Sequence, residues 1–281
     1  MYDYGKYSPP VSPPMSPMPS GLMTPPLTPA APQSPSTSRQ QQRHTATAKR
    51  HKYLRRLIKF QQMDFEYAFW QMVYLFVAPQ KVYRNFAYRK HTKDQWARDD
   101  PAFLVLLSFW LCVSSIGFAF VLRLTIIAFI KFLFWVIFVD CIGVGILIAT
   151  LFWFLSNRYL IVQPPRGQDV EWAYAFDVHL NAFFPLLMIL HFFQLPFLHT
   201  FINTDGIFAR IIGNTVWLFA IGYYIYITFL GYSSLPFLQK THVMLYPLTG
   251  LFLIYIISLL IGWNFSQGLC NFYSYRVLSS V

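Results

Sequence analysis

The chain has 281 residues, of which 56% are hydrophobic, 20% aromatic and only 12% charged. Soluble domains carry about 25% charged residues, so the composition excludes a soluble globular protein. The charge is also uneven, because residues 1–101 hold 15 of the 22 Lys and Arg but 6 of the 11 Asp and Glu. We therefore expect an all-α, polytopic membrane protein with a basic, water-exposed N-terminal third. Its predicted parts are a tail (1–42), a basic cytosolic segment (43–101), a membrane domain (102–276) and a short C-terminal tail (277–281).

The tail is rich in proline, with 11 of the chain's 19 prolines between Pro9 and Pro35. Such a segment cannot bury enough apolar surface to offset its chain entropy, so we expect it to be disordered with polyproline II character. Six of its residues precede a proline: Ser8, Ser12, Ser16, Thr24, Thr28 and Ser34. This pattern reflects either composition alone or a substrate for proline-directed kinases.

Residues 49–78 show the pattern of an amphipathic helix that ends before Pro79. Its first part has the basic and apolar faces of a helix in a membrane interface; the alternative is a helix packed on the rest of the protein. The stretch 65–78 is too short to span a bilayer, and whether it enters the membrane stays open. The basic residues that we assign to lipid headgroups or an acidic partner are Lys49, Arg50, Lys52, Arg55, Arg56 and Lys59.

Residues 81–98 combine basic and aromatic side chains, a composition that suits either RNA or an anionic lipid surface with a protein partner. The closeness of this segment to the first apolar run favours the second interpretation, so a nucleic-acid partner is not expected. Asp100 and Pro101 then indicate a helix start, with Asp100 as N-cap and Pro101 in the first helical position.

Five apolar runs are long enough to cross about 30 Å of hydrocarbon. They are Phe103–Leu122, Phe132–Leu155, Leu180–Phe201, Ile211–Leu235 and Val243–Phe265. The short connection 123–131 predicts a tight hairpin between the first two. With the N-terminus in the cytosol, 18 of the 22 Lys and Arg lie on the cytosolic side, as the positive-inside rule favours.

Two ionisable residues fall inside the predicted spans. Asp140 is costly at a membrane helix centre, by about 2.5–3.5 kcal/mol on insertion scales, and should face protein or water. His191 lies at similar depth in the next span. We expect the two side chains to form a hydrogen-bonded pair; Asp140 is also the residue on which a transporter would depend.

Asp177, His179 and Asn181 lie where a loop enters the third span, and Arg210 lies at the edge of the fourth. Asp-x-His near a membrane invites comparison with a metal-dependent lipid hydrolase. On a helix, however, residues 177 and 179 point about 200° apart, and no pair matches His-x-x-x-His. Helix capping and interfacial anchoring explain these residues better, so no metal or other cofactor is expected.

Smaller features are structural. Cys112, Cys141 and Cys270 show no spacing typical of a metal site or a disulfide, and we expect them to be buried thiols. Gly145 and Ala149 are spaced for close helix contact. Asn264 begins an N-glycosylation sequon beside the membrane, and we expect it to stay unmodified.

Six runs of the sequence carry a resemblance to a known family. They are Tyr53-Leu-Arg-Arg-Leu, Gln62-Met-Asp-Phe-Glu, Lys93-Asp-Gln-Trp-Ala-Arg-Asp-Asp-Pro101-Ala-Phe-Leu, Glu171-Trp-Ala-Tyr-Ala-Phe-Asp-Val-His-Leu-Asn181, Gly222-Tyr-Tyr-Ile-Tyr and Gly262-Trp-Asn-Phe. Over roughly residues 43–276 the chain resembles the UNC-fifty family of endomembrane proteins, which agrees with five spans and a cytosolic N-terminus.

The resemblance implies residence in the Golgi, with an inner nuclear membrane location also suggested, and a role in vesicular trafficking. It further implies contact with Sec7-type exchange factors for Arf GTPases and support for delivery of receptors such as nicotinic acetylcholine receptors. RNA binding has been suggested within the family. No catalytic residues are implied, so a non-enzymatic protein is expected. The alternatives are a lipid-metabolising enzyme with Asp177, His179 and His191 as metal ligands, or a small transporter.

Overall fold

Helices make up the regular structure of the described residues, apart from one isolated bridge between Ile161 and Leu238. The computed structural model describes residues 59–93, 96–98, 100–162, 169–197, 204 and 206–278, all within the single unit Thr47–Val281. The predicted all-α class is confirmed. The predicted disordered tail and the basic residues at positions 49, 50, 52, 55 and 56 lie outside the described residues.

Five helices are long and apolar enough to cross a membrane: Ala102–Val121, Ile126–Leu160, Trp172–Phe197, Ile207–Ser233 and Thr241–Ile261. The predicted number of spans is thus confirmed, and the chain is a multi-pass membrane protein. The boundaries differ: the second, third and fourth spans begin earlier than predicted, at Ile126, Trp172 and Ile207, and the fifth ends at Ile261 instead of Phe265. The second span, for example, begins at Ile126, so the predicted connection 123–131 shortens to a tight turn that includes Arg123 with φ 50°.

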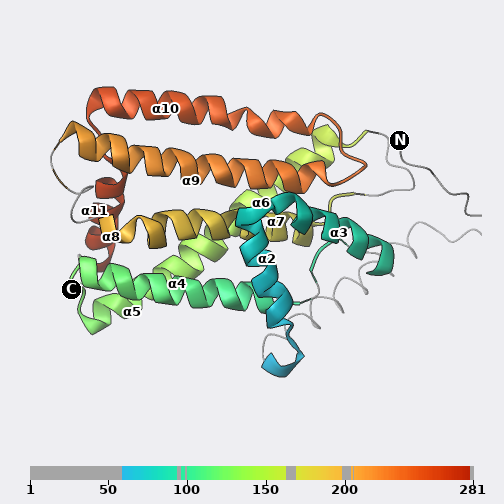
Figure 1. Ribbon diagram of the computed structural model, residues 1–281, viewed down its shortest axis with the longest axis horizontal. Helices are drawn as coiled ribbons and strands as arrows, with labels where there is room; N and C mark the ends of the chain where they lie inside the picture. The colour runs from blue at the N-terminus through green and yellow to red at the C-terminus, as the bar shows by residue number, and fades with distance from the viewer. Residues whose placement is uncertain are drawn as a thin grey trace, which may run out of the picture. The chain divides into compact units, whose positions relative to one another are not determined.

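The spans are built from successive helical elements (Figure 1). The first is α4 (Ala102–Val121). The second runs through α5 (Ile126–Phe134), the π-helical η2 (Trp135–Gly143), α6 (Val144–Leu155) and the π-helical η3 (Ser156–Leu160). The third comprises α7 (Trp172–Leu187), the π-helical η4 (Met188–Phe193) and α8 (Leu195–Phe197). The last two are α9 (Ile207–Ser233) and η6 (Thr241–Leu245) with α10 (Pro247–Ile261).

The third span is the centre of the bundle, because half of its most apolar 18-residue stretch is buried, whereas only 11–28% of the corresponding stretch is buried in each of the other four spans. It packs between α6 and α9. A Cβ atom built on Gly145 would lie 2.7 Å from the His179 ring on α7, and Ala149 is fully buried. The predicted close helix contact at Gly145 and Ala149 is therefore confirmed.

Two helices precede the spans. The predicted continuous helix 49–78 is wrong between Lys59 and Asp64, because a short 3-10 turn, η1 (Phe60–Gln62), is followed by extended backbone at Met63. The helix α2 (Phe65–Val77) then starts where the Asp64 side chain accepts a hydrogen bond from the Tyr67 amide at 2.9 Å. It ends before Pro79, as predicted, since a residue preceding proline disfavours helical backbone.

Pro79 opens the next helix, α3 (Pro79–Lys93). In Figure 1, α2 crosses the bundle, and α3 extends from one end of it. We call this end, with the beginnings of α4 and α7 and the last turn of α9, the α3 end.

A helix that the sequence analysis did not foresee, α11 (Phe265–Leu278), lies at the other end of the bundle, which we call the α11 end (Figure 1). It contacts α9 and α5. The chain turns into it at Gly262, whose φ of 79° suits glycine and ends α10. Of the three cysteines, Cys141 and Cys270 are buried, as expected, whereas Cys112 is half-buried.

Candidate functional site

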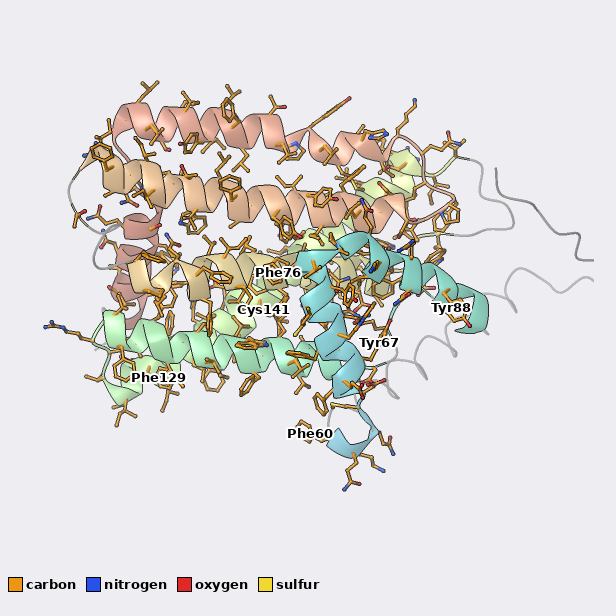
Figure 2. The ribbon with its side chains drawn as sticks, viewed as in Figure 1. Phe60, Tyr67, Phe76, Tyr88, Phe129 and Cys141 are labelled. Atoms are coloured by element: carbon orange, nitrogen blue, oxygen red, sulfur yellow. The ribbon has the colours of Figure 1, made fainter. Side chains whose placement is uncertain are left out.

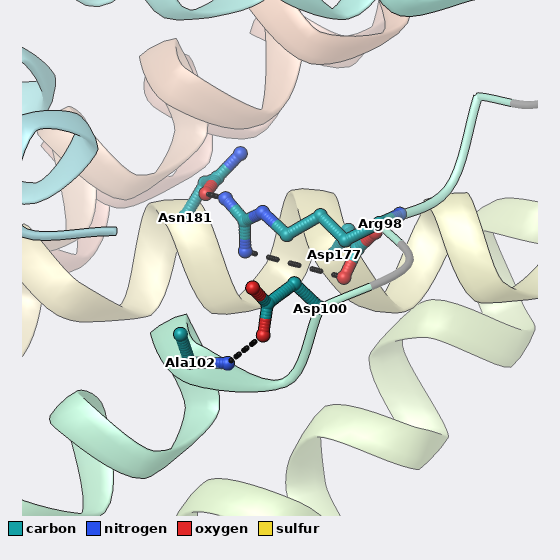
Figure 3. A network of polar contacts seen from close by, with 5 residues as sticks. All are labelled: Arg98, Asp100, Ala102, Asp177 and Asn181. Carbon is teal, nitrogen blue, oxygen red and sulfur yellow. Dashed lines mark hydrogen bonds and ion pairs between the residues drawn. The ribbon is translucent and has the colours of Figure 1, made fainter. Parts of the chain in front are cut away.

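A buried polar network surrounds Arg98, which lies between α3 and α4 and is 8% exposed (Figure 3). Its guanidinium donates a hydrogen bond to the Asn181 side-chain oxygen and lies 4.0 Å from the Asp177 carboxylate. Its backbone amide donates to the same carboxylate at 2.6 Å. Asp177 and Asn181 are four residues apart on α7 and so share one face of it. The network therefore attaches the segment before α4 to the central span.

The two residues before Arg98 are attached in the same way. The backbone amides of Trp96 and Ala97 each donate to one oxygen of the Glu171 carboxylate, both at 3.3 Å. Glu171 directly precedes α7. Three successive amides are therefore held by carboxylates at the beginning of one helix, which fixes this short segment against the α3 end.

Aromatic rings complete the surroundings of the guanidinium. The Arg98 guanidinium carbon lies 4.0 Å from the ring centroid of Phe103 and 5.3 Å from that of Phe86. A buried charge is costly unless it is paired with an opposite charge. The faces of the two aromatic rings attract the guanidinium as well, because a ring face carries partial negative charge. Tyr83 of α3 is also buried and faces Asn181; burial raises the pKa of its hydroxyl above the usual range, so this group is neutral at physiological pH.

Asp100 links the starts of two helices. One of its carboxylate oxygens accepts from the Ala102 amide at 3.0 Å, as the predicted N-cap role requires, although α4 begins one residue later than expected (Figure 3). Its other oxygen accepts from the Asp64 amide at 2.8 Å. The first residues of α2 and α4 are thus held at the same level.

The residues compared with a metal hydrolase lie inside α7, so the predicted helix-capping role is wrong, and they have separate partners. Asp177 and Asn181 contact Arg98, whereas His179 lies on another side of α7 with its Nδ1 atom 2.8 Å from the Tyr224 hydroxyl. The described residues contain no group of three or more His, Cys, Asp or Glu that could hold a metal.

The predicted Asp140–His191 pair is wrong. Asp140, in η2, accepts a hydrogen bond from the Tyr273 hydroxyl of α11 at 2.8 Å. His191, in η4, has its Nδ1 atom 3.5 Å from the Ser114 hydroxyl. The ring of Phe118 packs against both His191 and Tyr273, so apolar rings stand between the two ionisable groups.

The remaining predicted residues lie near the ends of the bundle. Arg210 is in the first turn of α9 at the α11 end, where its guanidinium lies against Gly262. Lys59 is exposed just before η1 and is the one predicted lipid-binding residue that the structure describes. Lys81 and Arg84 of α3 are exposed as well, and the Lys81 ammonium lies 5.1 Å from the centroid of the Tyr74 ring.

Sequence reasoning did not single out Arg98, Tyr83 or Tyr273 as site residues. Arg98 stands in an Asp-rich stretch, and its partners on α7 are 79 and 83 residues away. No short motif links them. The signal that was available is the high cost of burying Asp177 and Asn181, which requires a polar partner from elsewhere in the chain.

Five spans, with a helical hairpin fastened to one end by a buried Arg–Asp–Asn network, define a multi-pass membrane protein built around its central third span. Residues 53–274 match the model of the UNC-50 family. The chain belongs to this family, which confirms the resemblance seen in the sequence.

The chain aligns with named relatives over most of their length. The Protein unc-50 homolog of Bos taurus is 65% identical over 241 residues, which cover 86% of this chain and 93% of the relative. The human homolog is 65% identical over 240 residues, covering 85% and 93%. The Drosophila melanogaster homolog is 59% identical over 233 residues, covering 83% and 84%. No solved structure matches the chain.

Proposed function

We propose that this chain is a non-enzymatic membrane protein of the Golgi that acts in vesicular trafficking. Its α3 end faces the cytosol and positions a soluble partner, a Sec7-type exchange factor for Arf GTPases, on an anionic leaflet. The resemblance to the UNC-fifty family supports the compartment, the partner and a contribution to delivery of receptors such as nicotinic acetylcholine receptors. The orientation is supported by the 18 of 22 Lys and Arg that it assigns to the cytosolic side.

The observation that carries the proposal is the arrangement of α3. Val82, Tyr83 and Phe86 are buried, whereas Lys81 and Arg84 are exposed. The Arg98 network holds the segment that follows α3. Basic side chains are thus presented at a fixed place beside the membrane, which suits recruitment of a partner together with anionic lipid.

The same burial disfavours nucleic acid as the partner. Three of the four aromatic residues of the segment 81–98, Tyr83, Phe86 and Trp96, are buried among other side chains, and Tyr88 alone is exposed. Buried rings cannot stack on the bases of a single-stranded RNA. The exposed charges of this segment therefore suit phosphate headgroups and an acidic protein surface better than RNA.

The test is proximity labelling in cells that lack the endogenous protein, with a labelling enzyme fused to the N-terminus. One variant replaces with Gln the six basic residues Lys49, Arg50, Lys52, Arg55, Arg56 and Lys59. A second variant is Lys81→Gln/Arg84→Gln. The matched control, Arg123→Gln/Lys131→Gln, removes two exposed charges from the α11 end.

We expect the intact protein and the control to label a Sec7-type factor and the six-residue variant to lose it. Each basic residue near an anionic leaflet contributes about 1 kcal/mol to the attraction to lipid, so the double variant should label the factor less than the control and more than the six-residue variant. Unchanged labelling by the six-residue variant, or no exchange factor with the intact protein, would contradict the proposal. Fluorescence localisation in the nuclear envelope instead of the Golgi would contradict the compartment.

A further inference from the structure

The helix α2 has three distinct faces. Its inner face packs on the bundle through buried residues: Ala68, Gln71, Met72 and Leu75. A second face is apolar yet between 37% and 75% exposed, and it comprises Phe69, Val73, Phe76 and Val77. These four residues, which we call the α2 stripe, follow helical spacing and form one continuous surface. In water, such a surface would be unfavourable.

The beginning of α2 lies level with the beginning of a span. The Asp64 amide donates to the Asp100 carboxylate, which also caps α4. With 20 residues, α4 is about 30 Å long, which matches the hydrocarbon thickness. Since α4 has no length to spare, its first residues mark the boundary of the membrane, and α2 starts at that boundary.

The end of α2 lies beside the membrane-spanning part of the bundle. The Phe76 ring packs against Phe184 of α7 and Tyr223 of α9, with ring centroids 5.8 and 6.4 Å away. With 27 residues, α9 is about 40 Å long, roughly 10 Å more than the hydrocarbon, so Tyr223, about 15 Å before its last residue Ser233, still lies within the hydrocarbon. The α2 stripe therefore adjoins the surface that the spans turn toward lipid.

Several backbone groups at this end have partners within the protein. A helix leaves its last carbonyls without partners, and hydrocarbon offers no water to take their place. Here the Tyr223 hydroxyl donates to the Leu75 carbonyl at 2.7 Å, and the Ala78 amide donates to the Tyr74 carbonyl at 2.9 Å. The Lys81 amide donates to the Ala78 carbonyl at 2.9 Å. Such closure is what a helix end in a membrane requires.

The following helix returns toward the α3 end. Tyr83 lies next to Gly231, near the last residue of α9, since a Cβ atom on Gly231 would be 3.2 Å from the Tyr83 ring. The chain thus passes from the level of Tyr223 to that of Gly231 between residues 76 and 83. In Figure 2, Phe76 lies against the bundle, Tyr67 and Phe60 lie farther along α2 and η1, and Tyr88 lies on the outward part of α3.

The third face of α2 is aromatic and amphipathic. Tyr67, Trp70 and Tyr74 are half-buried and their rings contact one another in order, with ring centroids 5.8 and 4.4 Å apart. Tyr and Trp favour the membrane interface. The basic Lys81 beside Tyr74 places a charge where anionic headgroups lie. A face for headgroups thus lies beside a face for acyl chains on the same short helix.

We propose that α2, which crosses the bundle (Figure 1), lies in one leaflet, the leaflet at the α3 end, and that the α2 stripe binds the acyl chains of its lipids. The chain reaches this leaflet at Asp64, follows it along α2, turns at Ala78–Pro79 and leaves it along α3. This inference does not depend on the recruitment of an exchange factor. It gives the α3 end a direct contact with the lipid interior in addition to its basic surface.

The experiment is site-directed spin labelling of the full chain reconstituted in phosphatidylcholine nanodiscs. Single cysteines are introduced by Phe69→Cys and Val77→Cys on the α2 stripe, and by Lys81→Cys and Arg84→Cys on exposed positions of α3. Leu147→Cys, exposed in the middle of the second span, is the reference for contact with lipid. The background replaces Cys112, Cys141 and Cys270 with Ala, and its fold is checked by size exclusion and by the spectrum at position 147.

Collisions with oxygen, which concentrates in hydrocarbon, are compared with collisions with a water-soluble nickel chelate. We expect labels at 69 and 77 to match the label at 147, with loss of nickel collisions, while labels at 81 and 84 keep them. Nickel collisions at 69 and 77 equal to those at 81 would overturn the proposal by placing the stripe in water. Protection of 69 and 77 from both reagents would also overturn it, because a protein surface would then cover the stripe.

Discussion

The two ends of the bundle are closed by different chemistry. At the α3 end, the ionic groups Arg98, Asp177 and Glu171 hold a segment that is 74–83 residues away from its partners in the chain. At the α11 end, the contacts that join α9 to the end of α10 are made by neutral groups: Asn214 donates to the Ser258 hydroxyl at 2.9 Å and to the Trp263 carbonyl at 2.7 Å.

The difference has a physical consequence. In a neutral network, removal of one partner leaves a buried polar group unpaired, at a cost of about 1–3 kcal/mol. A buried ion pair behaves otherwise, because removal of one partner leaves an uncompensated charge. The α3 end is therefore stable only while its network is complete, and the α2–α3 hairpin depends on that completeness.

The largest effect is expected from Arg98→Met. This change leaves the Asp177 carboxylate buried without its guanidinium, which should lower the free energy of unfolding by about 3–5 kcal/mol. Thermal unfolding of the purified protein in nanodiscs, followed by tryptophan fluorescence, measures it. The double variant Arg98→Met/Asp177→Leu removes both charges and should recover part of the loss. A double variant as unstable as the sum of the single ones would show that the pair does not interact.

A smaller effect is expected at the other end from Asn214→Leu. Asn214 also accepts from the Phe265 amide at 3.0 Å, so the change removes partners from α10 and from the start of α11. We expect a loss of about 1–3 kcal/mol, the cost of leaving a buried polar group unpaired. The neighbouring Thr215→Val is the control, because it removes the single contact with the Tyr255 hydroxyl. If Asn214→Leu proved more damaging than Arg98→Met, the contrast between the two ends would be wrong.

Features that depend on neighbouring residues, such as spans and helix starts, could be predicted from the sequence. Long apolar runs predicted five spans, and Asp100 before Pro101 predicted the start of α4 within one residue. Asp64 is equally good as a cap, but the apolar pattern on either side concealed it and led to one continuous helix. α11 mixes polar and aromatic residues without a clear apolar face, so its sequence pattern did not predict a helix.

The candidate site was harder, because it depends on contacts between distant parts of the chain. The sequence singled out Asp177, His179 and Asn181 as notable at the membrane edge, and the structure brings two of them to one partner, Arg98. Asp140 was expected to meet His191 because the only other polar group considered at that depth was a histidine. Tyr273 was overlooked, since a helix at the α11 end was not expected.

The smallest effect concerns Asn264, where we expect no modification at all. This side chain is buried, and its oxygen accepts from the Ser266 and Gln267 amides at 3.1 and 3.3 Å, which caps α11. A glycan needs an accessible amide nitrogen, so the sequon should remain unused even though the proposed orientation places it in the lumen. Gel mobility before and after glycosidase treatment should be unchanged.

A second sequon, appended after Val281 through a flexible spacer, serves as the control and should receive one glycan under the proposed orientation. A glycan on Asn264 would contradict its role as a buried cap. An appended sequon that stays unmodified would instead contradict the lumenal position of the α11 end, and with it the cytosolic position of the α3 end. The two sites together therefore separate an error in the local structure from an error in the orientation of the whole bundle.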